Sequence, residues 1–138
     1  MTNDSIELVR TSWALVSTEP RLLAAAFYQR LFTIAPATRP MFAADLSKQL
    51  DKFSGMLNWI VRHLDDAPAL VAQVTDLGSR HDGYGVMHEH YALVGDALLW
   101  ALAERLGDRF TDDTRAAWRE AYLLLAALMQ RPRRVSHS

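Results

Sequence analysis

The chain has 138 residues, of which 50% are hydrophobic and 22% are charged, and its formal net charge is −1. This balance is typical of one globular domain and lacks the positive excess of a nucleic-acid-binding surface. There is no cysteine, which excludes disulfides, thiolate metal sites and cysteine nucleophiles. The N-terminus has no signal-peptide layout, and no apolar run approaches the roughly 20 residues of a membrane span, so we expect a cytoplasmic protein.

Apolar residues in the first part of the chain recur at intervals of three and four, which predicts helices. Asp4 or Ser5 can cap a first helix. Its apolar face comprises Ile6, Val9, Trp13 and Val16. A second helix is predicted from Pro20 to Thr33. Its buried side comprises Leu23, Ala24, Phe27, Tyr28 and Leu31. The Tyr28 hydroxyl can lie at the rim of the core or point into a ligand cavity.

The segment 34–40 is bounded by prolines and can hold one turn of helix at most. A third helix is predicted from about Leu46 to His63, opened by Asp45 or Ser47. Its apolar stripe comprises Leu46, Leu50, Phe53, Leu57, Ile60 and Val61. Gln49 lies one step off this stripe, as a solvated boundary residue does, and Lys52 lies at its edge. His63 is predicted to lie at the surface.

A fourth helix is predicted from Pro68 to His81, where Gly83 and Gly85 follow and would end it. Val74, Leu77 and His81 share one face, so an apolar stripe ends in an imidazole. A buried imidazole needs a partner, which can be a metal ion or a backbone carbonyl. His88 and His90 do not form a comparable pair, because residues two apart on a helix do not share a face.

Two more helical patterns complete the chain. The fifth carries Tyr91, Val94, Leu98, Leu102 and Leu106, and the last, capped by Thr111, carries Ala117, Trp118, Tyr122, Leu125 and Met129. No segment alternates with the period of a strand. The sequence therefore predicts an all-α protein, with a single domain over residues 1–130 and a basic, disordered tail over 131–138.

Several chemistries have no support in the sequence. There is no glycine-rich phosphate loop, no H-E-x-x-H zinc motif and no G-x-S-x-G nucleophile motif. The carboxylates are scattered along predicted solvated faces, where nothing would tune them for acid–base catalysis.

Four segments together resemble the globins, and in particular single-domain bacterial haemoglobins related to the haem domain of flavohaemoglobins. The resemblance covers nearly the whole chain. It rests on the sequences FYQRLF at 27–32, PATRPMF at 36–42, LGSRH at 77–81 with YGV at 84–86, and HYALVGDALL at 90–99. Each segment alone is weak evidence, and their order and spacing make the resemblance specific.

The resemblance implies a role for each matching residue. His81 takes the place of the proximal histidine that ligates haem iron, with the Leu77 carbonyl as the acceptor for its other ring nitrogen. Tyr28 and Gln49 take the places of the distal donors. Phe42 would pack flat on the porphyrin and Phe53 would wall the space over the iron. Lys52 and Arg80 would pair with the propionates, and the remaining wall residues would be Tyr84, Val86, Tyr91 and Val94.

The fold implied is a three-over-three helical sandwich around one haem b. The implied function is reversible, high-affinity binding of O2, and also of CO and NO, for oxygen binding or transport by a monomer or weak homo-oligomer. The alternative is a nitric oxide dioxygenase that uses a separate flavin reductase, because we expect no reductase domain in this chain.

One departure concerns the proximal side. In flavohaemoglobins a tyrosine, matched here by Tyr91, acts with a late glutamate on the proximal histidine. The last glutamate of this chain is Glu120, which comes too early. The strong electron push of peroxidase-like chemistry is therefore not expected.

Overall fold

A computed structural model describes residues 1–83 and 88–130, with side chains described for 1–77 and 89–130. All regular secondary structure of these residues is helical. Six α-helices and two 3-10 segments follow one another: α1 Asn3–Val16, α2 Pro20–Ile34, η1 Pro36–Met41, α3 Ser47–Arg62, α4 Ala67–Gly83, α5 His88–Leu106, η2 Gly107–Arg109 and α6 Asp112–Met129. The tail 131–138 lies outside the described residues.

The helix ends show where local prediction was right and where it was wrong. Thr111 caps α6, as predicted, and its hydroxyl oxygen accepts from the Thr114 amide. The cap of α1 is Thr2, and neither Asp4 nor Ser5 serves, because the helix begins earlier and the Ser5 amide donates back to the Thr2 hydroxyl. α4 continues through His81 to Gly83.

The corner after α2 is longer than the single turn predicted. It forms six residues of 3-10 helix with prolines at its start and inside it. Thr38 is buried there, and its hydroxyl donates to the Ala35 carbonyl oxygen at 2.7 Å. This bond supplies a partner to a polar side chain that would otherwise be costly to bury.

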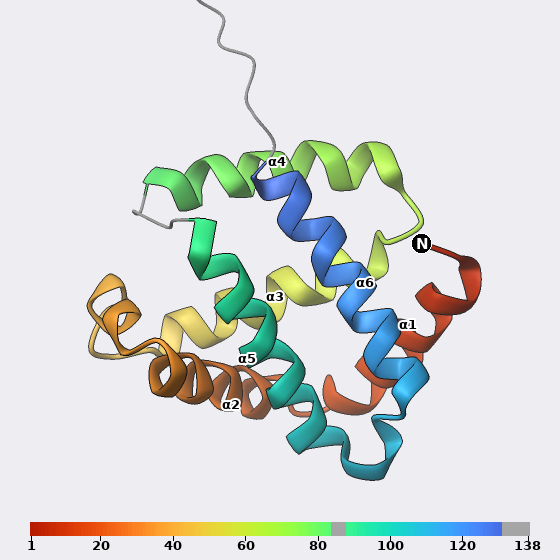
Figure 1. Ribbon diagram of the computed structural model, residues 1–138, viewed down its shortest axis with the longest axis horizontal. Helices are drawn as coiled ribbons and strands as arrows, with labels where there is room; N and C mark the ends of the chain where they lie inside the picture. Colours follow the sequence, from red (N-terminus) through yellow and green to blue (C-terminus); the bar gives the residue numbers. More distant parts are fainter. Residues whose placement is uncertain (84–87, 131–138) are drawn as a thin grey trace, which may run out of the picture.

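The helices form two layers, with α1, α3 and α4 in one and α2, α5 and α6 in the other. α6 crosses α1 and α4, while α2 is crossed by α5 and also packs against α3 (Figure 1). The apolar faces predicted for α1 and α2 are all buried. Burial of these faces is the main stabilising contribution, at roughly 25 cal/mol for each Å² of apolar surface.

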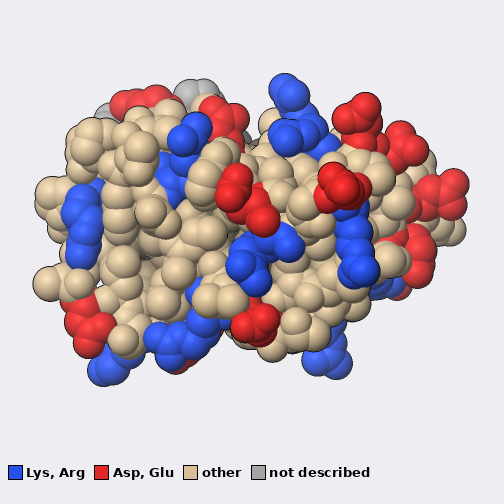
Figure 2. Space-filling model, turned by 90° about the horizontal axis from the view of Figure 1, so that it is seen from below, with Lys and Arg blue, Asp and Glu red and all other residues tan. Residues whose placement is uncertain are grey.

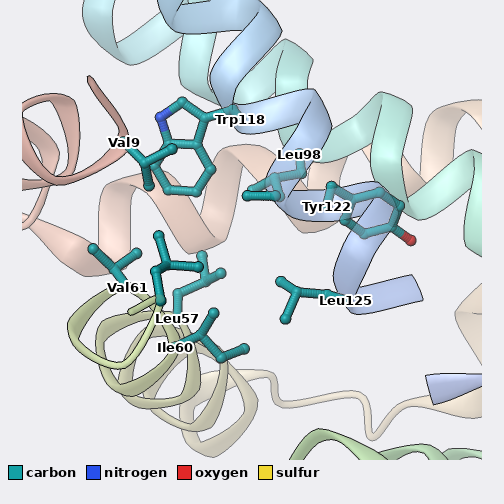
Figure 3. A pocket seen from close by; sticks show the side chains of 10 residues that line it. Val9, Leu57, Ile60, Val61, Leu98, Trp118, Tyr122 and Leu125 are labelled. Carbon is teal, nitrogen blue, oxygen red and sulfur yellow. The ribbon is translucent and has the colours of Figure 1, made fainter. Parts of the chain in front are cut away.

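The centre of the core lies where α1, α3, α5 and α6 meet. Val9, Leu57, Leu98 and Trp118 converge around a cavity of only about 10 Å³ (Figure 3). That volume is close to the minimum that holds a single water molecule. This crossing is therefore a packed core and not a ligand site.

Two buried tryptophans connect α1 with its neighbours through their ring N–H groups. Trp118 Nε1 donates to Ser12 Oγ at 2.8 Å, and Trp13 Nε1 donates to Asn58 Oδ1 at 3.0 Å. The two indole rings also contact each other, with centroids 6.4 Å apart. These bonds fix the register of α1 against α6 and α3, because a shift along the helix would leave buried donors unpaired.

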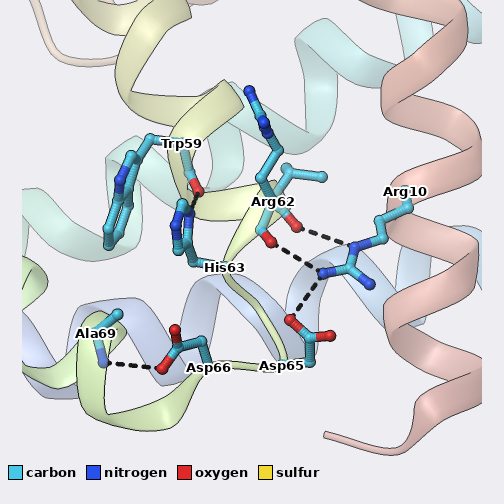
Figure 4. Close-up of polar contacts among 8 residues, drawn as sticks. Arg10, Trp59, Arg62, His63, Asp65, Asp66 and Ala69 are labelled. Carbon is cyan, nitrogen blue, oxygen red and sulfur yellow. Dashed lines mark hydrogen bonds and ion pairs between the residues drawn. The ribbon is translucent and has the colours of Figure 1, made fainter.

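The corner between α3 and α4 is held from α1 by Arg10 (Figure 4). Arg10 Nε donates to the Val61 carbonyl at 3.2 Å, and Nη2 donates to the Arg62 carbonyl at 3.1 Å and to Asp65 Oδ1 at 3.0 Å. The hydrogen bond from Arg10 holds the pKa of the Asp65 carboxyl below its ordinary value. One guanidinium thus caps the C-terminal end of α3.

His63, at the same corner, was predicted to lie at the surface, and the structure corrects this. Its ring is half-buried and stacks on the Trp59 indole, with centroids 4.1 Å apart. Nδ1 donates to the Trp59 carbonyl at 2.7 Å, which assigns the proton to that nitrogen. The stacking could not be read from helical periodicity, because His63 lies beyond the last regular turn.

The described surface carries mixed charge. On the face shown in Figure 2, acidic and basic side chains are interspersed, and neither sign dominates. In the described part of the chain, no helix is long and apolar enough to cross a membrane.

Gly95 of α5 makes close packing with α6 possible, and this generates a test. A Cβ atom at Gly95 would lie 2.6 Å from Tyr122 Cε2, so Gly95→Ala should displace that ring and lower the free energy of unfolding by about 1–3 kcal/mol. The control is Gly55→Ala in α3, where a Cβ would meet nothing within 4 Å; it should raise stability by about 0.5–1 kcal/mol. Urea unfolding followed by circular dichroism measures both, and equal effects would contradict the packing argument.

Candidate functional site

A buried pair of polar side chains joins α2 to α3. Tyr28, on α2, has 4% of its surface exposed, and its hydroxyl accepts a hydrogen bond from Gln49 Nε2 at 2.8 Å. Gln49 lies in the first turn of α3 and is half-buried, so it is not a solvated boundary residue. Although it lies one step off the apolar stripe, its long side chain reaches across to Tyr28.

The environment of Tyr28 favours its protonated form. Burial raises its pKa to about 12, although the hydrogen bond from Gln49 acts in the opposite direction. Since the Gln49 amide occupies a lone pair of the phenol oxygen, the phenol proton is left to donate to a third group. The pair can therefore present one O–H donor at all physiological pH values.

Aromatic rings surround the Tyr28 ring. Phe42 and Phe53 approach it edge-on, with centroids 5.3 and 5.5 Å away, and Phe32 lies at 5.9 Å. Phe27 stacks on Phe53 at 4.4 Å. These contacts come from α2, from α3 and from the residue that ends η1, so three segments converge on one phenol. The surroundings exclude water from the ring and strengthen any hydrogen bond that its hydroxyl makes.

A pocket of about 240 Å³ lies between α3 and α4. Its lining consists of apolar side chains and one glutamine: Met56, Trp59, Ile60, Gln73, Val74 and Leu77. Met56 and Ile60 continue a row on α3 that begins with Gln49 and Phe53, at spacings of four, three and four. The donor pair and the pocket therefore belong to the same face of α3.

The residues around this gap fit a haem. A porphyrin needs a mostly apolar slot with few polar groups, and the described lining has this composition. His81 lies on α4, four residues after the pocket-lining Leu77. Its side chain, like those of Arg80, Tyr84 and Val86, lies outside the described residues, so these four assignments stay predictions.

The remaining predicted wall residues lie in described helices. Tyr91, on α5, is buried, and Val94 is half-buried one turn later. Lys52 is exposed on α3, as a propionate partner near the surface would be. Within the part of the chain with described side chains, no group of histidine, cysteine, aspartate and glutamate residues is arranged to hold a metal ion.

Sequence reasoning missed the role of Tyr122. Its hydroxyl donates to the Tyr91 carbonyl at 2.5 Å, and the missing side chain of Gly95 gives its ring room. Burial raises the pKa of Tyr122 above its ordinary range. Glu120 makes its contacts at the N-terminus of the chain: its carboxylate accepts a hydrogen bond from Ser5 Oγ and pairs with the N-terminal ammonium. Helical spacing marked Tyr122 as a core residue but could not show which carbonyl its hydroxyl reaches.

The globin family model matches residues 25–129. The chain belongs to the globin family. A flavohaemoprotein of Halalkalibacterium halodurans is 29% identical over 129 residues, which cover 91% of this chain and 31% of that protein. The chain spans about a third of the length of the flavohaemoproteins that it matches.

Solved structures agree with this assignment. A bacterial globin from Campylobacter jejuni has a TM-score of 0.80 at 23% identity, with 91% of each chain covered, and shows the shared fold. An engineered carbene transferase, made from a candidate nitric oxide dioxygenase of Rhodothermus marinus, has a TM-score of 0.83 and is 31% identical, covering 94% of this chain and 90% of that one. The predicted all-α globin fold is confirmed, and the chain is a haem-binding, gas-binding protein.

The raised pKa of Tyr28 predicts a stability loss at high pH. At pH values below 10.0, the ordinary pKa of tyrosine, Tyr28 is protonated in both the folded and the unfolded state, and its contribution to the free energy of unfolding is fully present. As the pH rises towards about 12, only the unfolded state ionises readily, so stability falls by roughly 2–3 kcal/mol. Urea unfolding between pH 8 and pH 11.5 should show the wild type losing more stability than Tyr28→Phe. Parallel curves would contradict the burial of this phenol.

Proposed function

We propose that this globin binds O2 reversibly and with high affinity at the iron of haem b, with Tyr28 as the distal donor and His81 as the proximal ligand. The observation that carries the proposal is the 2.8 Å hydrogen bond from Gln49 to the buried Tyr28 hydroxyl. A buried phenol whose proton has no acceptor among the described side chains is suited to stabilise a ligand that acquires negative charge.

The helix geometry supports placing Gln49 and His81 on opposite sides of one haem. α3 and α4 are joined by the short corner 63–66, so they diverge from it. At a rise of 1.5 Å per residue, Gln49 lies about 20 Å from the corner along α3, and His81 lies about 22 Å from it along α4. Two residues at matching distances from a common corner lie at the same level along their helices, which is compatible with the proposed roles.

When bound, the haem supplies an iron atom that takes a diatomic gas as a ligand. The protein supplies the surroundings. Tyr28 donates its hydroxyl proton toward the gas, and Gln49 holds the phenol oxygen so that the proton points away from the amide. With a haem bound, Phe42 would pack on the porphyrin and Phe53 would exclude water beside it. His81 would hold the iron, and its second ring N–H would donate to the Leu77 carbonyl and so fix its tautomer.

The other wall residues have supporting roles in the proposal. Lys52 and Arg80 would pair with the propionates, where exposed ion pairs contribute only about 0–1 kcal/mol each. The remaining wall around the haem would be formed by aromatic and apolar side chains: Tyr84, Val86, Tyr91 and Val94. Because these contacts are mostly apolar, they retain the haem by burial and leave the distal donor to discriminate between gases.

A second function is nitric oxide dioxygenation. It is favoured by the 31% identity to the engineered protein made from a candidate nitric oxide dioxygenase. One NO, one O2 and one electron give one nitrate, so turnover needs an electron donor, for which we propose a flavin reductase. Nitrate formation in the presence of such a reductase tests this function. If turnover stalls after one equivalent with the reductase present, the dioxygenase function is excluded.

Replacing the distal phenol tests the main proposal. Tyr28→Phe should raise the O2 dissociation rate about tenfold or more, because the ligand loses a donor in a water-poor site. Gln49→Leu should raise it less, and should have little further effect in a Tyr28→Phe background, since Gln49 acts through Tyr28. Stopped-flow displacement of O2 by CO measures these rates. An unchanged rate in Tyr28→Phe would mean that the phenol points away from the gas.

The proximal ligand is tested by haem retention. His81→Ala should lose stable haem binding, because the axial bond disappears. The matched control is His63→Ala, whose ring already bonds to the Trp59 carbonyl and stacks on its indole; this variant should keep its haem. Absorption spectra of the oxidised, dithionite-reduced and CO-bound forms measure haem content, and the pyridine haemochrome identifies haem b. Full haem content in His81→Ala would assign the axial bond to another residue.

A further inference from the structure

Arg39 lies in the corner after α2, where its side chain contacts both the backbone and one of the aromatic rings that surround Tyr28. It lies on η1, three residues before Phe42. Its Nη1 donates to the carbonyl oxygens of Phe42, at 3.2 Å, and Ala43, at 3.0 Å. Its Nη2 donates to the carbonyl of Ala44 at 3.1 Å. One side chain thus holds three consecutive carbonyls of the segment that leads from η1 into α3.

The same guanidinium also contacts α2. Its central carbon lies 4.9 Å from the centre of the Phe32 ring, which is a cation–π contact. Phe32 lies one turn after Tyr28 on α2, and its ring is 5.6 Å from that of Phe42. Arg39 therefore joins the two phenylalanines that pack beside Tyr28.

The backbone adds a second link between Arg39 and Phe42. The Phe42 amide donates to the Arg39 carbonyl at 3.1 Å, while the Arg39 side chain donates to the Phe42 carbonyl. Phe42 has an extended backbone and no helix of its own to fix it. Both of its peptide groups are thus bonded to Arg39.

We propose that Arg39 is a positioning residue for the distal donor: it holds Phe42 and Phe32 against the Tyr28 ring and so fixes the direction of the Tyr28 hydroxyl. The proposal rests on the function proposed above for Tyr28. It requires the planar fork and face of a guanidinium, since a lysine ammonium cannot bond three carbonyls in a row while lying flat on a ring.

The test uses the full haem-loaded chain with CO as the probe. Arg39→Met keeps the aliphatic stem and removes the guanidinium. The C–O stretching band of the CO complex should then broaden and shift toward the frequency of the Tyr28→Phe variant, because the phenol no longer holds one direction. The O2 dissociation rate should rise about fivefold. In a Tyr28→Phe background, Arg39→Met should change this rate less than about twofold.

A matched control separates this effect from loss of a surface cation. Arg115 lies 4.9 Å over the Phe110 ring at the start of α6, at the same distance as Arg39 over Phe32. Arg115→Met should leave the C–O band and the O2 dissociation rate unchanged. Arg39→Lys keeps the charge and should recover little of the wild-type band.

A further readout does not depend on gas binding. Hydrogen exchange of the amides in the segment 42–46 should become faster in Arg39→Met and stay unchanged in Arg115→Met, because Arg39 orders this segment through its carbonyls. Thermal unfolding of each variant measures global stability separately. Arg39→Lys serves as the second variant if Arg39→Met does not fold.

Two results would overturn the proposal. The first is an unchanged C–O band in Arg39→Met, whether or not the unfolding temperature falls. The second is full recovery by Arg39→Lys, which would show that the charge alone acts. Failure of the proposed function is distinguishable, because Tyr28→Phe by itself would then leave the O2 dissociation rate unchanged.

Discussion

A phenol held away from water is the constraint on which the rest of the site depends. Burying a hydroxyl without a partner costs a few kcal/mol, so Tyr28 can be buried only where another group bonds to it. Gln49 supplies that bond from the start of α3. This requirement fixes α3 against α2, and the surrounding aromatic rings then fill the space between the two helices. The arrangement that stabilises the core also leaves the hydroxyl proton of Tyr28 without an acceptor among the described side chains.

Much of the fold was predictable because helical periodicity records burial directly. Apolar residues spaced three and four positions apart predicted the helices and their buried faces. Proline and threonine residues predicted several of the helix ends. The errors occurred where the chain leaves regular helix. Thr2 caps α1 because helices begin where a hydroxyl can reach an amide, and several residues near the terminus offered one. His63 is half-buried because a neighbouring indole covers it, which no periodic pattern records.

The site was predictable only in part, and the reason is again physical. Periodicity alone assigned Gln49 to a solvated edge, whereas the resemblance to globins placed it beside Tyr28, where the structure also has it. A long side chain can reach over a neighbour, so its Cα position does not determine its environment. Tyr122 bonds to a carbonyl 31 residues earlier in the chain, and Arg39 bonds to carbonyls that its own side chain reaches only because the backbone turns back at this corner. Neither arrangement leaves a periodic pattern in the sequence.

The two ends of α3 are held in the same way, and this explains how the helix can stay in place beside the pocket between α3 and α4. Arg39 donates to the carbonyls just before the helix, and Arg10 donates to the carbonyls at its C-terminal end. Each guanidinium belongs to a different segment, η1 or α1, so α3 is tied to the body of the protein at both termini. Guanidinium bonds to carbonyls are stronger than neutral hydrogen bonds, and two such groups oppose both sliding and tilting of the helix. α3 is therefore held at both ends, while α4, on the other side of the pocket, packs on α6.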